Sequence, residues 1–291
     1  MADATLARLS RPSVQTDSFW VIPPLLVLAV LFFYPLSLIA TQAFTNGTGP
    51  VSLTQFGAVL GSAVFRSALL HTIEISISAS AGCLLLGFVI ALVLSFAPFP
   101  GARVVARLID TFIALPTFLI ALAFTFIYGS AGVLNGALMG ALHFETPPID
   151  FLYSPWGVIL AEVTVYTPFV LRPLLATFSL IDIAQIEVAS SLGAKPWRVV
   201  REIILPAAIP ALLAGGSLCL LLTVNEFGIV LFIGAKGVIT LPLLVYDKAI
   251  QEFDYTAACV IALINVFLSL ALYFVYRLLV GRLGGRRAGL V

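Results

Sequence analysis

Residues 75–102 read ISISASAGCLLLGFVIALVLSFAPFPGA and contain no Asp, Glu, Lys or Arg. A second run without any of these residues extends over positions 19–65. A helix needs about 20 predominantly apolar residues to cross the hydrocarbon core of a bilayer, and both runs exceed that length. A helix exposed to water would instead carry charged side chains along one face. The two runs therefore predict an integral membrane protein.

The rest of the chain has the same character. Of its 291 residues, 61% are hydrophobic and 10% are charged, whereas about a quarter of the residues in soluble domains are charged. Six stretches are long and apolar enough to span a membrane, so the predicted fold class is all-α with six transmembrane helices. The run that begins at residue 19 is too long for the apolar part of a signal peptide, and we expect it to remain as the first helix. The six stretches are residues 20–44, 69–96, 108–128, 156–178, 207–233 and 255–280.

The distribution of Lys and Arg predicts the orientation. With six spans, both termini lie on the same side, and the tails and loops of that side hold eleven of the fifteen Lys and Arg residues, against three on the other side. Cytoplasmic segments carry such an excess. Both termini and the loops at 97–106 and 179–206 are therefore predicted to face the cytoplasm. The eleven residues are Arg8, Arg11, Arg103, Arg107, Lys195, Arg198, Arg201, Arg277, Arg282, Arg286 and Arg287.

The sequence lacks the residues that several other classes of function would require. The net charge is +1, and no basic tract is interleaved with aromatic residues, which argues against binding of nucleic acid. Cys83, Cys219 and Cys259 lie far apart in apolar segments, without the spacing of a metal site. The sequence therefore predicts no metal, no cofactor and no catalytic residue.

The most informative stretch is 180–210, LIDIAQIEVASSLGAKPWRVVREIILPAAIP, which lies between the fourth and fifth predicted spans. Asp182 is a candidate helix N-cap, with Gln185 three residues later as in a capping box. Gly193 is a candidate C-terminal stop. We therefore expect a short helix over residues 183–192.

A second helical piece is expected over residues 197–204, after a turn at Pro196. Pro206 would then sit in the first turn of the fifth span, where its missing N–H costs little. Two short helices joined rigidly to two membrane helices could transmit a movement of a soluble partner to the membrane helices.

This loop is similar to the coupling loop of binding-protein-dependent ABC importer permeases, whose pattern is E-A-A, three residues, G, nine residues, I-x-L-P. Val188 departs from the pattern, because the family usually has Ala there. An amphipathic interfacial helix that only connects two spans is the alternative, but six matching positions in a loop assigned to the cytoplasm by its charge favour the coupling loop. The six are Glu187, Ala189, Gly193, Ile203, Leu205 and Pro206, and we add Val188 and Ala194 as further candidates for contact with the ATPase.

The resemblance covers roughly residues 65–280 and implies the type I, MetI-like transmembrane domain in a bacterial inner membrane. It implies a second permease copy or a homologous permease, two cytoplasmic ATP-binding subunits and an external solute-binding protein. The predicted organisation is a cytoplasmic tail at 1–18, a first helix with its outer loop at 19–65, and a permease core at 66–280. The core contains the coupling loop at 180–206, and a basic tail follows at 281–291.

The chain lacks a nucleotide site of its own. No G-x-x-x-x-G-K-[ST] stretch is present, and the only lysines are Lys195, Lys236 and Lys248. We therefore expect ATP hydrolysis to occur in a separate subunit, and this chain not to be an enzyme.

Ionisable side chains inside the membrane indicate either a substrate path or a buried pair. Glu162 and Arg172 are ten residues apart on the fourth span, about 15 Å along its axis, so they cannot pair with each other. Asp110 is expected to pair locally with Arg107. The candidate substrate path comprises Asn225, Glu226, Glu162 and Arg172, and a structural pair of Glu226 with Arg172 or another helix remains the alternative.

Residues 225–258, NEFGIVLFIGAKGVITLPLLVYDKAIQEFDYTAA, resemble the branch of the family that imports polyamines, thiamine, ferric iron and aminoethylphosphonate. The resemblance is greatest to permeases for 2-aminoethylphosphonate, which is the expected substrate, with the other three as alternatives. An ion-coupled secondary transporter would use the same intramembrane charges but would not need the coupling loop. An intramembrane hydrolase would need a nucleophile motif such as H-E-x-x-H or G-x-S-x-G, and none is present.

Overall fold

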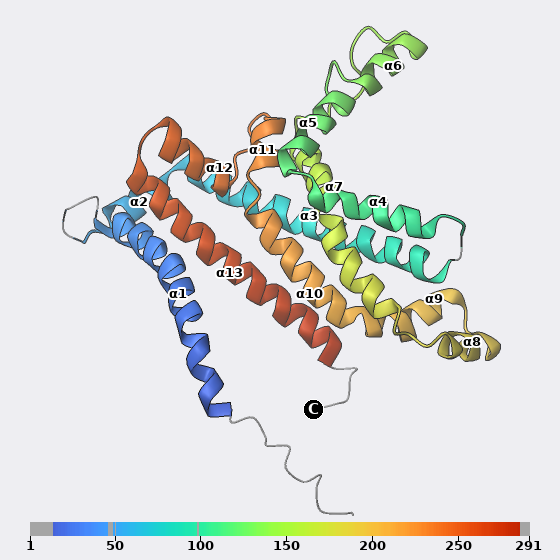
Figure 1. Ribbon diagram of the computed structural model, residues 1–291. Coiled ribbons are helices and arrows are strands. Elements are labelled where there is room, and N and C mark those ends of the chain that lie inside the picture. Colours follow the sequence, from blue (N-terminus) through green and yellow to red (C-terminus); the bar gives the residue numbers. More distant parts are fainter. Residues whose placement is uncertain (1–13, 46–48, 50, 98, 286–291) are drawn as a thin grey trace, which may run out of the picture.

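The computed structural model describes residues 14–45, 49, 51–97 and 99–285. Four of the predicted cytoplasmic cations, Arg8, Arg11, Arg286 and Arg287, lie outside this part of the chain. Among the described residues all regular structure is helical (Figure 1). The helices are α1 Val14–Thr45, α2 Thr54–Gly61, α3 Ala63–Phe96, α4 Ala102–Ala114, α5 Thr117–Tyr128, α6 Val133–Leu142, α7 Pro155–Phe178, α8 Ile183–Ser191, α9 Pro196–Val199, α10 Leu205–Val224, α11 Gly228–Ile233, α12 Leu241–Tyr246 and α13 Tyr255–Gly285, with π-helical segments at Val200–Ile204 and Asp247–Gln251.

Six helical stretches in the described part of the chain are long and apolar enough to cross a membrane, which confirms the predicted number. Four of them match the predicted spans to within six residues at either end. The third and fifth differ. The stretches are Trp20–Thr45, Ala63–Phe96, Thr117–Leu142, Pro155–Phe178, Pro196–Val224 and Tyr255–Arg282.

The centre of the bundle is formed by α3, α7 and α10, which pack against one another. Small residues let these helices approach closely. A Cβ atom at Gly215 of α10 would lie only 2.9 Å from the Cα of Val170 on α7. The face of α3 that is buried in this core is likewise built largely of small side chains, namely Ser76, Ala79, Ser80, Cys83 and Gly87.

The helix α1 lies at the edge of the bundle, beside α13 (Figure 1). Most of its described side chains are exposed, several toward its C-terminal end are partly buried, and Ala43 is the one that is buried. Since its exposed side chains are apolar, we expect lipid or another membrane protein to cover them. The end of the bundle near α2 and α12 is closed by a second apolar cluster that includes Phe65, Leu241 and Ile261.

The third predicted span, residues 108–128, is wrong as a single helix. The structure divides it into α4 and α5 at Leu115 and Pro116. Proline has no N–H to donate and disfavours the helical conformation in the residue before it. Leu115 accordingly has an extended backbone, with φ −85° and ψ 134°. The helix α4 lies along α7, and the stretch long enough to span continues instead through α5 and α6.

The fifth predicted span, residues 207–233, is wrong at both ends. The helical run begins at Pro196 and ends at Val224, and the separate helix α11 starts at Gly228. Pro206 lies in the first turn of α10, as predicted, but the helical run does not start there, because the π-helical turn Val200–Ile204 leads directly into α10. This wider turn, in which the N–H of Leu205 donates to the carbonyl of Val200, accommodates a residue without an N–H.

Candidate coupling loop and substrate path

The helix α8 has the predicted N-terminal cap. The backbone N–H of Ala184 donates to Oδ1 of Asp182 at 3.0 Å. This bond satisfies one of the N–H groups that have no partner inside the helix. Gln185 supplies its backbone N–H to the carbonyl of Asp182, but the structure gives its side chain no bond back to Asp182, so the reciprocal half of a capping box is not formed.

Gly193 ends α8 as predicted. Its φ is +84°, a left-handed conformation that residues with a Cβ rarely adopt. The N–H of Ala194 donates to the carbonyl of Ala189 at 3.0 Å, and the N–H of Gly193 donates to that of Ser190 at 2.9 Å. These two bonds are those of the Schellman motif, which fixes the direction in which the chain leaves the helix.

The two sides of α8 differ in what they contact. Ile186, Ala189 and Ala194 pack against the central apolar cluster. Glu187 and Val188 point away and are exposed, and the side chain of Val188 is 59% accessible. The departure from the family pattern at Val188 therefore lies on the face that is open to a partner. Further large apolar side chains are exposed around it, namely Leu180, Ile183, Leu192 and Trp197.

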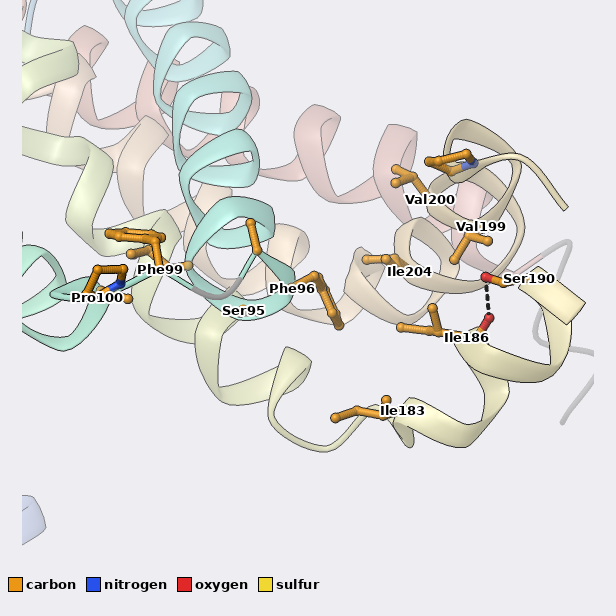
Figure 2. Close-up of a pocket in the computed structure, with 14 residues that line it drawn as sticks. Ser95, Phe96, Phe99, Pro100, Ile183, Ile186, Ser190, Val199, Val200 and Ile204 are labelled. Carbon is orange, nitrogen blue, oxygen red and sulfur yellow. Dashed lines mark hydrogen bonds between the residues drawn. The ribbon is translucent and has the colours of Figure 1, made fainter.

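A cavity of about 930 Å³ lies behind α8, between the end of α3 and the helical run that starts at α9 (Figure 2). Its lining is largely apolar. Figure 2 shows Ile183, Ile186 and Ser190 on α8, with Val199 and Ile204 on the neighbouring run. The described side chains leave this space between α8 and the bundle unfilled.

The remaining residues of the family pattern lie on the helical run that starts at Pro196. Ile203 is in its π-helical turn, and Leu205 and Pro206 open α10. All three are partly buried, and Ile203 packs against the central cluster. The run continues without a break to Val224, about 43 Å at the rise of an α-helix. This continuous helical run, which we call the rod, therefore connects the candidate coupling loop at one end to Asn225 and Glu226, which follow its other end.

Asn225 lies just after α10 and connects it to α13. Its Nδ2 donates to Oγ of Ser269 at 3.3 Å, and its Oδ1 accepts from Nδ2 of Asn265 at 3.0 Å. Polar side chains thus join α10 to α13, although Oδ1 of Asn265 is buried without a hydrogen-bond partner among the described residues.

Glu226 points toward a different neighbour. Its carboxylate accepts a hydrogen bond from the hydroxyl of Tyr166 on α7 and another, at 2.8 Å, from the backbone N–H of Ile229 on α11. The side chain is buried, with 6% of its surface accessible. Asn225 and Glu226 are adjacent in sequence, but they bind groups on different helices.

Glu162 is the most deeply buried of the candidate residues, with 1% of its surface accessible. In the described part of the chain, neither of its carboxylate oxygens has a hydrogen-bond partner. It lies close enough to Glu226 and Cys83 to interact with them electrostatically. Two acidic groups thus occupy one apolar region beside Tyr166.

Arg172 binds Asp110 instead of Glu226. Its Nε donates to Oδ1 of Asp110 at 2.8 Å, so the pair joins α7 to α4. The expected local pair of Asp110 with Arg107 is wrong, and so is the alternative pair of Glu226 with Arg172. The reason is the packing of α4 along α7, which places Asp110 beside a cation from another helix.

Tyr166 is not among the residues predicted for the substrate path, although its place in the sequence indicates that it lies beside one of them. It lies four residues after Glu162, and residues at that spacing share a face of a helix. A tyrosine hydroxyl inside a membrane span needs a hydrogen-bond partner. The pair Ser80 and Thr223, whose hydroxyl oxygens are 3.1 Å apart, was missed as well and joins α3 to α10.

The comparisons with known proteins agree with this arrangement. The family model described as binding-protein-dependent transport system inner membrane component matches residues 83–288. The protein from Salmonella typhimurium that is named "Putative 2-aminoethylphosphonate transport system permease protein PhnU" is 63% identical over 279 residues, which are 96% of this chain and 98% of that protein. A probable sulfate transport system permease from Chlorokybus atmophyticus is 32% identical over 65% of this chain and 64% of its own length.

Solved structures show the same fold at low identity. A chain of a bacterial ABC transporter that imports the acidic polysaccharide alginate superimposes with a TM-score of 0.76 at 17% identity, covering 91% of this chain and 94% of its own. A chain of the MetNI methionine ABC transporter gives a TM-score of 0.55 at 17% identity, covering 74% and 94%. With the family match extending over more than half of its length, this chain belongs to the binding-protein-dependent transport system inner membrane components, which are multi-pass membrane proteins.

Proposed function

We propose that this chain is the permease subunit of an ATP-binding-cassette importer for 2-aminoethylphosphonate. The observation that carries the proposal is the 63% identity, over 96% of the chain, to a permease named for that substrate. The relatives named for sulfate are less similar, at 32% identity or below. The capped and exposed α8 supplies the element that an ATP-driven mechanism requires.

The division of labour follows from what the chain contains. It carries no phosphate-binding loop of the P-loop type, so ATP is hydrolysed by two separate cytoplasmic subunits. An external solute-binding protein delivers the substrate, and a second permease, identical or homologous, completes the passage. The chain lies in the bacterial inner membrane with its coupling loop at 180–206 facing the cytoplasm, as the excess of Lys and Arg on that side indicates.

The coupling residues divide into two groups by position. Glu187 and Val188 form the contact with the ATPase, and the turn at Gly193 and Ala194 holds that contact at a fixed angle to the next helix. Movement of α8 then passes into the rod Pro196–Val224. The far end of the rod carries Asn225 and Glu226, so a displacement at the ATPase reaches the candidate substrate path.

The candidate path residues suit a zwitterion. 2-Aminoethylphosphonate carries an ammonium group and a phosphonate group. The carboxyl groups of Glu162 and Glu226 lie near one another in the core and are of the sign that attracts an ammonium group, although Tyr166 covers Glu226 in this conformation. Arg172 is of the sign that attracts a phosphonate.

The proposal is tested by uptake into proteoliposomes that contain this chain together with its ATPase and its permease partner. The loaded binding protein is placed outside and ATP inside. We expect uptake of labelled 2-aminoethylphosphonate that requires both ATP and the binding protein, and that is not reduced by excess polyamine, thiamine, ferric iron or sulfate. Uptake that persists without the ATPase and follows a proton or sodium gradient would show a secondary transporter instead.

A further inference from the structure

Arg172 uses only part of its hydrogen-bonding capacity. A guanidinium group has five N–H donors. The structure gives it one bond, from Nε to Asp110, and no other partner among the described residues. Its side chain is 55% accessible. The two terminal nitrogens, which form the end-on fork of the group, are therefore free to bind another acceptor.

This cation lies within a membrane span. Arg172 is six residues before the end of α7 at Phe178, about 9 Å along the helix axis. An arginine at such a depth is costly unless its remaining donors meet an acceptor or water. Asp110 holds the guanidinium by Nε and leaves the fork open, which is the geometry needed to bind two oxygens of a planar or tetrahedral anion.

The neighbouring helix α4 carries two further cations on the face that holds Asp110. Arg103, Arg107 and Asp110 follow one another on α4 at spacings of four and three residues, so they share one face of that helix. Arg103 and Arg107 are both exposed, and neither forms an ion pair within the part of the chain that the structure describes. With Arg172, this region holds three cations and one carboxylate.

The geometry points to an oxyanion site in which the terminal nitrogens of Arg172 bind two oxygens of a phosphonate or phosphate group, with Asp110 as the positioning residue and Arg107 as an added cation. A tetrahedral phosphorus oxyanion fits, because arginine forks bind it through two parallel N–H···O bonds. The ligand is the phosphonate group of the transported substrate, which rests on the proposed function, or the phosphate of an anionic lipid at the membrane surface.

The test distinguishes an oxyanion site from an ion pair that only holds α4 and α7 together. Arg172→Gln removes the fork and the ion pair together. Asp110→Asn removes the negative charge of the pair but keeps the guanidinium and an oxygen acceptor for Nε. Arg277→Gln, at an exposed position on α13, controls for the loss of a cation elsewhere. Each variant is reconstituted with the full complex, once in phosphatidylcholine and once with added phosphatidylglycerol.

If the ligand is the substrate, Arg172→Gln lowers the maximal uptake of 2-aminoethylphosphonate at least tenfold in both lipids, while the rate of ATP hydrolysis is kept. Asp110→Asn then keeps most of the uptake, and Arg277→Gln keeps all of it. If the ligand is a lipid, phosphatidylglycerol raises the thermal unfolding midpoint of the wild-type complex, and Arg172→Gln abolishes that shift whereas Arg277→Gln keeps it.

The inference is overturned if Arg172→Gln matches the wild type in uptake and in its response to phosphatidylglycerol. It is also overturned if Asp110→Asn loses as much uptake as Arg172→Gln, because the pair would then act only as a tie between helices. Failure of the wild-type complex to import 2-aminoethylphosphonate would refute the proposed function instead, and the unfolding measurement with phosphatidylglycerol would still decide whether Arg172 binds an oxyanion.

Discussion

The hydroxyl of Tyr166 on α7 donates a hydrogen bond to the carboxylate of Glu226, the second residue after α10. Because α10 is continuous with the helical run that begins at Pro196, this bond fastens the far end of that run to the core of the bundle. A displacement of α10 relative to α7 would stretch or break it. Glu226 thus lies where a movement that begins at the ATPase would change the surroundings of a buried carboxylate.

Tyr166→Phe is expected to destabilise the folded protein by about 1–3 kcal/mol, because it leaves a buried carboxylate with one donor fewer. Resistance of the purified complex to denaturant in detergent measures this effect. Tyr273→Phe is the matched control, since that hydroxyl accepts a bond from Arg277 at an exposed site and should change stability by less than about 0.5 kcal/mol. Equal stability of the two variants would show that the Tyr166 bond contributes little.

Glu226→Gln keeps the shape of the side chain and removes its charge. If the carboxylate attracts the ammonium group of the substrate, the variant should assemble with the ATPase, keep basal ATP hydrolysis and import 2-aminoethylphosphonate more slowly. Uptake by the reconstituted complex over a range of substrate concentrations checks this. Unchanged uptake at every concentration would remove Glu226 from the path, and loss of the assembled complex would assign it a structural role.

Gly193→Pro and Glu187→Lys should leave membrane insertion intact and uncouple ATP hydrolysis from transport. Proline has a fixed negative φ and cannot adopt the +84° of Gly193, so the turn after α8 would change direction. Glu187→Lys reverses a charge on the exposed face of α8. The measured quantity is the amount of substrate imported per ATP hydrolysed.

Gly237→Pro is a matched control for the turn at Gly193, because Gly237 also has a positive φ, at +75°, but lies in the loop between α11 and α12. We expect this variant to keep its ratio of transport to hydrolysis. Full transport by both Gly193→Pro and Glu187→Lys would refute the coupling-loop assignment.

Labelling of single cysteines checks the orientation. A cysteine replacing the exposed Lys195 should react with a membrane-impermeant maleimide only from the cytoplasmic side, and one replacing the exposed Lys236 only from outside. Cys83 and Cys219 are buried, so only the partly exposed Cys259 has to be replaced beforehand. Reaction at position 195 from outside would overturn the charge-based orientation.

Gly215→Val is expected to prevent normal packing of α10 on α7. The added Cβ would lie 2.9 Å from both the Cα of Val170 and the carbonyl oxygen of Phe169, which are backbone atoms and cannot rotate away. We expect at least a severalfold lower yield of folded protein by size-exclusion chromatography. Gly281→Val, at a helix position with nothing near the added Cβ, should keep the wild-type yield; the packing argument fails if the two variants behave alike.

The number of membrane spans and the caps of the short helix α8 could be predicted from the amino-acid sequence. Spans follow from the length of apolar runs, because lipid requires every backbone group in them to be bonded within its own helix. The N-cap at Asp182 and the stop at Gly193 depend on hydrogen bonds between residues close in sequence, so their residue types predict them. The helix break at Pro116 could also have been predicted locally, because proline disfavours a helical conformation in the residue before it, but the apolar residues on both sides indicated one continuous span.

Which polar groups meet inside the membrane could be learned only from the packing of the helices. Asp110 binds Arg172 from 62 positions away, and Glu226 binds Tyr166 from 60 positions away. Such partners depend on how each helix is rotated about its axis and how closely it approaches the next. Those quantities are set by the packing of small residues such as Gly215 against whole neighbouring helices, and the local pattern of one helix does not specify them.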